Sequence, residues 1–163
     1  MPDAGNIPQI RTATLCLLNS ERAERGRRVL RSNRTLRVAA QTYSEQMVRD
    51  SFFDHVSPTG GTLLGRIRGA TDYLRGTAAW SLGENLAWGS GERGTPGETV
   101  VAWMNSPGHR HNILDRGFRD IGIGVALGAP AATHGLPAAT YTTEFGHRVG
   151  DRARASRRRS SQR

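Results

Sequence analysis

Apolar side chains return at a helical period in the first third of the chain. From Ile10 to Arg25 they recur every three or four positions, and Gly26 then interrupts the pattern. A second, stronger stripe runs from Leu36 to Met47 between polar flanks. The sequence therefore predicts two amphipathic helices before residue 52, which would bury their apolar sides against one core.

Local signals place the ends of the second helix and predict two more helical segments. Ser32 or Asn33 can cap its first turn, and the stripe ends near Ser51. Leu63–Ile67 predicts one or two further turns. Thr95 followed by Pro96 is a helix start, and the helix it opens should end at the Ser-Pro-Gly run of residues 106–108, followed by a short turn.

The second half of the chain changes period. Segments 120–127 and 139–146 are rich in β-branched and aromatic residues and read as strands, separated by a loop of turn residues. A shorter strand is expected near residues 80–82, with a glycine-rich loop after it. Helices covering a small antiparallel sheet make an α+β domain.

Length and composition exclude several classes of protein. A chain of 163 residues suits one domain. With 36% hydrophobic and 23% charged residues, it lacks the composition of a disordered chain. Its longest apolar run is five residues, at positions 100–104, far short of the roughly 20 that a membrane-spanning helix needs.

The net charge of +9 is concentrated at one end, and every basic residue is arginine. Residues 151–163 hold six arginines and one aspartate, so this tail carries +5 and the preceding 150 residues carry +4. We expect a flexible segment over 1–10, a domain over 11–148 and a disordered arginine-rich tail over 149–163. The tail is either a solvated end or an arm for an anionic surface.

Cysteine content and the first residues bear on the cellular compartment. Cys16 is the single cysteine, so no internal disulfide exists, and its apolar helical context predicts a buried thiol. Residues 1–10 have neither a basic n-region nor an apolar h-region, so no signal peptide is visible in this chain.

Two histidines and one glutamate are the candidates for chemistry. His55 and His109 each lie beside a glycine- and proline-rich turn next to an apolar element, where a packed scaffold holds a loop in place. Two neutral imidazoles can bind a divalent metal such as zinc, and Glu84, a charge between two leucines, can orient one of them. The three residues can equally form a network that only ties loops together.

Established catalytic and nucleic-acid-binding patterns are missing from the sequence. It contains no HExxH, CxxC pair, GxSxG or phosphate-binding GxxxxGK[ST] motif. Aromatic residues make up 6% and do not alternate with the arginine clusters, and no helix-turn-helix or zinc-finger pattern is present. Nucleic acid is therefore not expected as a partner.

Five segments taken in order are nevertheless specific. They are LLNSERAERG (17–26), FFDHVSP (52–58), GENLA (83–87), WMNSPGHRHNIL (103–114) and IGIG (121–124). Together they resemble the CAP superfamily, also called the SCP or PR-1-like domain, in its short bacterial secreted form. The resemblance covers roughly residues 11–148 and implies a three-layer α/β/α sandwich around a small central antiparallel sheet.

The resemblance also implies a central cavity with two histidines and two glutamates. His55 and Glu84 take the places of the first pair, and His109 takes that of the second histidine, with eleven residues between it and Ile121. The family's second glutamate falls on Ser106, three residues after the helix tryptophan. Ser106 or the adjacent Asn105 can reach the same centre, but neither replaces a base.

By resemblance we expect a secreted or extracellular monomer whose His55–His109 pocket holds a divalent metal, with Glu84, Asn105 and Ser106 around it. The expected role is a binding or cell-envelope-associated module, with a cell-envelope polymer, lipid or sterol as partner. One alternative is a metal-dependent hydrolase of peptides or cell-wall polymers that uses His55, Glu84 and His109 as catalytic residues. Another is a basic surface- or lipid-binding protein.

Overall fold

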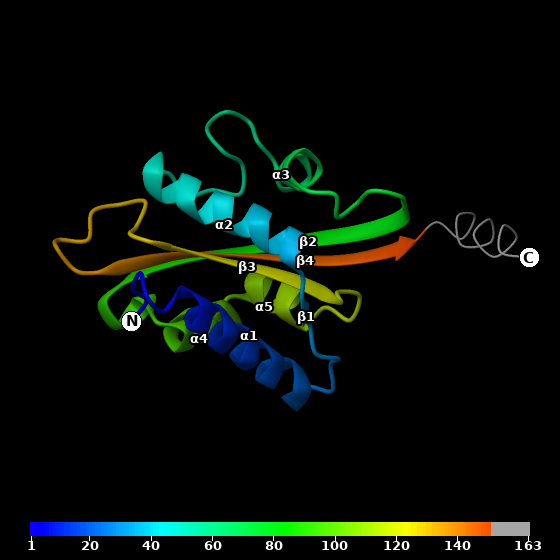
Figure 1. Ribbon diagram of the computed structural model, residues 1–163. Coiled ribbons are helices and arrows are strands. Elements are labelled where there is room, and N and C mark those ends of the chain that lie inside the picture. The colour runs from blue at the N-terminus through cyan, green and yellow to red at the C-terminus, as the bar shows by residue number, and fades with distance from the viewer. Residues whose placement is uncertain (151–163) are drawn as a thin grey trace, which may run out of the picture.

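A four-stranded sheet in the order β1–β3–β4–β2 forms the middle layer of the computed structural model, which describes residues 1–150 (Figure 1). β4 pairs antiparallel with both of its neighbours, whereas β1 pairs parallel with β3. The sheet is therefore mixed: its three long strands pair antiparallel as predicted, and the two-residue β1 adds one parallel pair. The strands are β1 (Arg31–Ser32), β2 (Thr77–Ser90), β3 (Asp120–Leu127) and β4 (Ala138–Gly150).

Helices cover both faces of the sheet, which confirms the predicted three-layer α/β/α sandwich. α2 and α3 lie on one face, and α1, α4 and α5 lie on the other (Figure 1). The helices are α1 (Ile7–Glu24), α2 (Arg34–Arg49), α3 (Leu63–Ala70), α4 (Pro96–Asn105) and α5 (Pro107–Leu114), with a 3₁₀ turn, η1, at Gly91–Gly94. None of the helices within residues 1–150 is long and apolar enough to cross a bilayer.

Two helix starts follow the capping signals in the sequence. The side-chain oxygen of Asn33 accepts hydrogen bonds from the backbone N–H groups of Thr35 and Leu36, at 3.0 and 3.1 Å. Thr95 caps α4 in the same way, with Pro96 in the first turn. These contacts satisfy N–H groups that have no partner within the helix.

Two elements are longer than the sequence pattern indicated. The expected turn after residue 107 is the eight-residue helix α5, whose pattern is weak because only Ile113 is buried. β2 runs through the segment expected to be a glycine-rich loop. Its glycines stand where neighbouring groups approach the strand too closely for a larger side chain. A Cβ on Gly83 would lie 2.8 Å from the ring of Phe118.

The main core lies between the sheet and the layer of α1, α4 and α5. Trp103 packs edge-on against Tyr141 with ring centres 6.5 Å apart, and its indole N–H donates to the carbonyl oxygen of Leu86 at 2.9 Å. Phe118 stacks on Phe145 at 5.5 Å. The two contacts of Trp103 fix α4 over β2 and β4, the strands that carry the two buried glutamates, Glu84 and Glu144.

The first helix begins earlier than the sequence pattern indicated. α1 starts at Ile7, inside the segment expected to be flexible, and the side-chain amide of Asn6 donates to the carbonyl oxygen of Met1 at 3.0 Å.

Cys16 is exposed, so the predicted buried thiol is wrong: it lies on the solvent side of α1, while Thr14 and Leu18 face the core. The arginine-rich tail from residue 151 lies outside the described residues.

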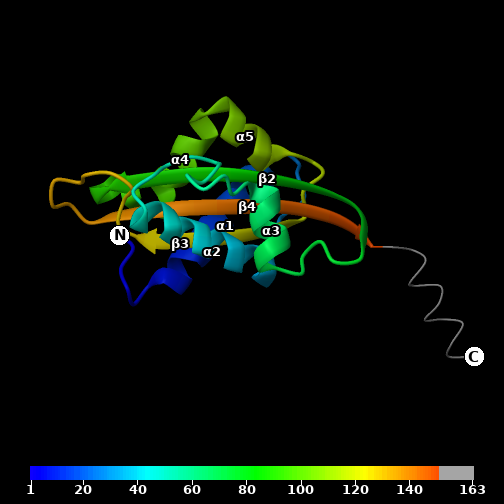
Figure 2. The same ribbon diagram turned by 90° about the horizontal axis from the view of Figure 1, so that it is seen from above.

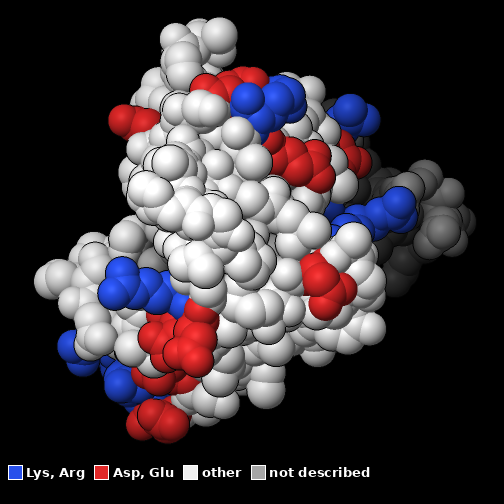
Figure 3. Space-filling view, turned by 90° about the vertical axis from the view of Figure 1, so that its left-hand side faces the viewer, with Lys and Arg blue, Asp and Glu red and all other residues white. Residues whose placement is uncertain are grey.

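Charges of both signs share the surface. Figure 3 views the end of the molecule at which the connection between β3 and β4 lies. Arginine and acidic side chains are interspersed there around a broad uncharged area. This end of the domain therefore shows no continuous basic face of the kind that non-specific binding to nucleic acid requires.

Candidate functional site at the edge of the sheet

The three candidate residues come from three different elements that meet at β2. His55 lies in the connection between α2 and α3, Glu84 lies in β2, and His109 lies in α5. β2 is the last strand of the sheet, and α5 lies alongside it, so residues from both helical layers can reach this edge (Figure 2). The loop that carries His55 and the helix that carries His109 both contact β2, through Glu84 and Asn85.

Glu84 anchors the imidazole of His55. The Glu84 side chain is only 3% exposed, and its Oε1 lies 2.7 Å from Nδ1 of His55. The His55 side chain is 57% exposed. The hydrogen bond to Glu84 raises the pKa of His55 above its ordinary value, although burial opposes this effect. The imidazole is thus held through Nδ1, and Nε2 is the ring nitrogen available to a ligand.

Arg66 of α3 neutralises Glu84 from the other side. Its guanidinium group donates to the second carboxylate oxygen of Glu84 and to the carbonyl oxygens of His55 and Gly61, at 3.2 and 3.0 Å. It also stacks on Tyr43, with the guanidinium carbon 3.3 Å from the ring centre. A single cation therefore holds both the carboxylate and the loop that carries His55.

Side-chain amides tie His109 to the edge strand. Asn85 donates to the carbonyl oxygen of His109 at 3.0 Å. Asn112 donates to the carbonyl oxygen of Glu84 at 3.1 Å and to the side chain of Asn85 at 2.9 Å. Burial, and next the nearby His55, lower the pKa of His109. The imidazole of His109 is therefore neutral at neutral pH, the form that binds metals.

The structure does not join the other two expected residues to this group. Ser106 occupies the N-cap of α5 without a side-chain cap. Asn105 lines a groove that contains none of the three central residues. Within residues 1–150, no hydrogen bond connects either side chain to His55, Glu84 or His109.

A second buried glutamate, which the sequence reasoning missed, lies next to Glu84. Glu144 of β4 is the direct cross-strand partner of Glu84 and is completely buried. Burial, and then the charge of Glu84, raise the pKa of Glu144 well above its ordinary value. One signal was available: Glu144 is the only charged residue in the strand segment ATYTTEFG, whose other residues suit a buried strand.

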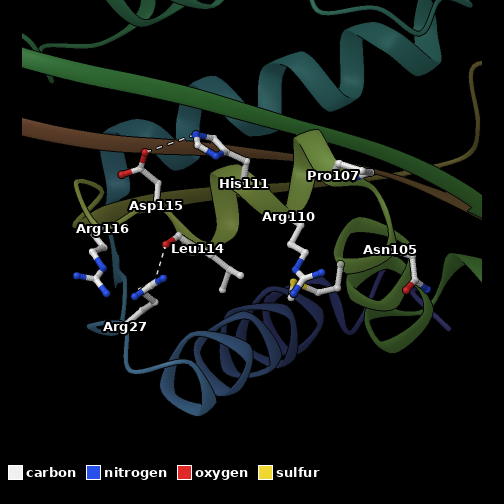
Figure 4. A pocket seen from close by; sticks show the side chains of 9 residues that line it. Arg27, Asn105, Pro107, Arg110, His111, Leu114, Asp115 and Arg116 are labelled. Carbon is white, nitrogen blue, oxygen red and sulfur yellow. Dashed lines mark hydrogen bonds and ion pairs between the residues drawn. The ribbon is translucent and has the colours of Figure 1, made fainter.

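A basic groove of about 560 Å³ lies on the opposite side of α5 (Figure 4). Arg27, Arg110 and Arg116 line it together with the carboxylate of Asp115, and Met104 and Leu114 contribute apolar surface. The Nε of Arg27 donates to the carbonyl oxygen of Leu114 at 3.1 Å. Among the described residues, none of the three guanidinium groups makes an ion pair.

Comparison with known proteins assigns the chain to a family. Residues 15–142 match the CAP family, described as the cysteine-rich secretory protein family. The chain belongs to the CAP family. The matched region includes all five residues expected in the site, and the resemblance inferred from the sequence is confirmed.

Two relatives of this CAP domain come from Bacillus subtilis strain 168. The uncharacterized protein YkwD is 40% identical over 108 residues, which cover 66% of this chain and 39% of YkwD. The uncharacterized membrane protein YlbC is 30% identical over 112 residues, covering 68% of this chain and 30% of YlbC. The chain thus spans well under half the length of these relatives.

Solved structures show the same fold. An extracellular protein with an SCP domain from Bacillus anthracis superposes with a TM-score of 0.63 and 28% identity, covering 86% of this chain and 40% of that one. An outer surface protein from Borrelia burgdorferi gives a TM-score of 0.65 at 20% identity, covering 86% of this chain and 94% of that one. At 20% identity, the likeness to the Borrelia burgdorferi protein shows a shared fold and nothing more.

The donor set of this CAP domain limits the kind of metal site it can form. Within residues 1–150, no group of three or more histidine, cysteine, aspartate or glutamate side chains is arranged to hold a metal ion. The nitrogens that fit are those of His55 and His109, since Glu84 is engaged by His55 and Arg66. A metal held by two imidazoles would complete its coordination with water or a ligand.

Proposed function

We propose that this CAP domain is an extracellular binding module that holds a divalent metal ion, zinc by preference, between His55 and His109. The observation that carries the proposal is the contact of 2.7 Å between Nδ1 of His55 and Glu84, because it leaves the other ring nitrogen free in an exposed imidazole. Imidazole nitrogens are favoured zinc ligands, and a carboxylate behind the ring is their usual support.

The surrounding residues prepare both imidazoles for a ligand. Glu84 accepts the Nδ1 proton of His55 and so selects the tautomer with an unprotonated Nε2. The lowered pKa of His109 keeps its ring neutral. The metal would supply a positive centre with open coordination positions for an anionic or carbonyl oxygen of a ligand.

Hydrolysis is less well supported than binding. A general base must take up a proton from the attacking water, and donors that stabilise a carboxylate as an anion make it a weaker base. Both oxygens of Glu84 are already engaged, one by His55 and one by Arg66. The family position of the second glutamate holds Ser106, which cannot act as a base at neutral pH.

Calorimetric titration with zinc tests the metal site. We expect the wild type to bind one ion and the His55→Ala and His109→Ala variants to lose most of the affinity. His134→Ala is the matched control, because His134 lies in the connection between β3 and β4, which carries none of the proposed site residues. Glu84→Gln should weaken binding by about 10- to 100-fold. Equal binding by wild type and His55→Ala would overturn the assignment.

The extracellular setting has a separate test. Two of the similar structures are described as an extracellular protein and an outer surface protein. In the organism that produces this protein, protease added to intact cells should degrade it, or the protein should appear in the medium. Complete protection until the cells are lysed would contradict this part of the proposal.

A second candidate function is the binding of a phosphate-bearing ligand in the groove of Figure 4. Three guanidinium groups without ion pairs border it, and guanidinium groups match phosphate oxygens in geometry and charge. Pyrophosphate is the probe. A triple substitution of Arg27, Arg110 and Arg116 by Gln should abolish its binding, while a triple substitution of the exposed Arg31, Arg34 and Arg75 should not. Equal losses would indicate general charge attraction instead.

A further inference from the structure

Glu144 is a buried acidic side chain without any visible partner. It is 0% exposed, and among residues 1–150 neither of its carboxyl oxygens accepts or donates a hydrogen bond. An ionised carboxylate in such a place loses its hydration and gains nothing in return, which is one of the most costly arrangements in a protein interior. The residue therefore needs either a counter-charge or a proton.

The charged groups around Glu144 supply no free counter-charge. Glu84, its neighbour on β2, repels a second anion. Arg66 on α3 is the nearby cation, but its guanidinium group is paired with Glu84. Tyr43 on α2 is a neutral phenol whose pKa is raised to about 12, and Gly122, the partner on β3, has no side chain. His55 acts on the pair only through Glu84.

The contacts of the two glutamates decide which of them is charged. Glu84 receives donors on both oxygens, from His55 and from Arg66, whereas Glu144 receives none. Two neighbouring carboxyl groups that share one cation do not both ionise, and the one with donors becomes the anion. The Nε of Arg66 is also buried without an acceptor, so this N–H group makes no hydrogen bond to Glu144.

We propose that Glu144 is the second acidic residue of the site: a neutral, protonated carboxylic acid from β4 that leaves Glu84 as the only anion facing Arg66 and His55. It is a positioning residue. An ionised Glu144 would compete for Arg66 and loosen its contacts with Glu84 and with the loop of His55. The acidic side chain that is missing at position 106, at the start of α5, thus has a counterpart in Glu144 of β4.

Infrared spectroscopy at pH 7 tests the protonation state directly. The wild type should show the carbonyl stretch of a protonated carboxyl group, and Glu144→Gln should lose it. Glu98→Gln, an exposed glutamate in the first turn of α4, is the control that should keep it. A wild type without this band, or a band that survives in Glu144→Gln, overturns the proposal.

Titration of His55 by NMR gives a second readout. Glutamine resembles a protonated glutamate, so Glu144→Gln should leave the titration midpoint of His55 unchanged. An ionised Glu144 would instead help to hold the proton on His55, and its replacement would shift the midpoint downward. The role of Glu144 deepens the proposed function, but neither readout involves metal, so failure of zinc binding and failure of this inference are distinguishable.

Discussion

Nδ1 of His55 and Oε1 of Glu84 lie 2.7 Å apart, and this contact joins an exposed loop to a buried position in the edge strand of the sheet. The exposed partner contributes the imidazole, and the buried partner determines how it is oriented. Because Glu84 is paired to β4 and to Arg66, the orientation of His55 depends on the core of the domain.

Replacing Glu84 with glutamine should release His55. Without the carboxylate, the pKa of His55 should fall from its raised value toward the ordinary value of 6.5. NMR titration of the ring protons measures this change. Glu92→Gln, in the η1 turn, provides a control of the same charge change. An unchanged titration in Glu84→Gln would mean that the contact has no part in holding the proton.

The two histidines should give opposite pH dependences of stability. The pKa of His55 is raised, so its contribution is complete below about pH 6.5 and is lost as the pH rises through the raised value. The pKa of His109 is lowered, so the domain loses stability as the pH falls below about 6.5 toward the lowered value.

Urea unfolding of His55→Gln and His109→Gln between pH 5 and 8 separates these effects. Relative to the wild type, His55→Gln should be most destabilising at the acidic end. His109→Gln should become less destabilising, or stabilising, there. The same pH trend in both variants would contradict the assignment of opposite shifts.

The buried acid should also leave a mark on stability. The pKa of Glu144 is raised in the folded protein, so the folded state keeps a proton that the unfolded state releases above about pH 4.5. Stability should therefore fall by about 1.4 kcal/mol per pH unit from that point up to the raised pKa. Glu144→Gln removes this loss: it should match the wild type near pH 4 and exceed it at pH 7 in urea unfolding.

Two glycines of β3 are predicted to be essential for the packing of α2. A Cβ on Gly122 would overlap the backbone of Leu36, and one on Gly124 would overlap the backbone of Ala40. Gly122→Ala should cost about 1–3 kcal/mol or more, because backbone atoms cannot move aside as side chains can. Gly108→Ala, in α5 with nothing within 4 Å of the added carbon, is the control that should fold normally.

The elements that the sequence predicted correctly share a strong local signal. α2 and α4 have capping residues whose hydrogen bonds depend on neighbours two or three positions away, and β3 and β4 have a high density of β-branched residues. The elements it missed, β1, α5 and most of β2, have weak patterns. In β2, for example, Gly83 is needed because the ring of Phe118 lies close to it, and the strand is held by its pairing with β4.

The residues of the candidate site also differ in how strong their local sequence signal is. The ordered motifs were enough to nominate His55, Glu84 and His109 and to assign the family, since those residues stand within segments of specific sequence. The partners Arg66 and Glu144 stand in no such segment. Arg66 contacts Glu84 from 18 positions away in the chain, and Glu144 lies beside it through the pairing of β2 with β4. No periodicity along the chain predicts either contact.

By itself the sequence determined the fold class and the family and nominated three candidate site residues, because helical stripes, caps and motifs are properties of neighbouring positions. Only the tertiary structure decided which groups carry charge at the edge of β2. The protonation of His55, Glu84 and Glu144 depends on burial, on one shared arginine and on the pairing of two strands. Those quantities exist only when segments distant in the chain are packed together.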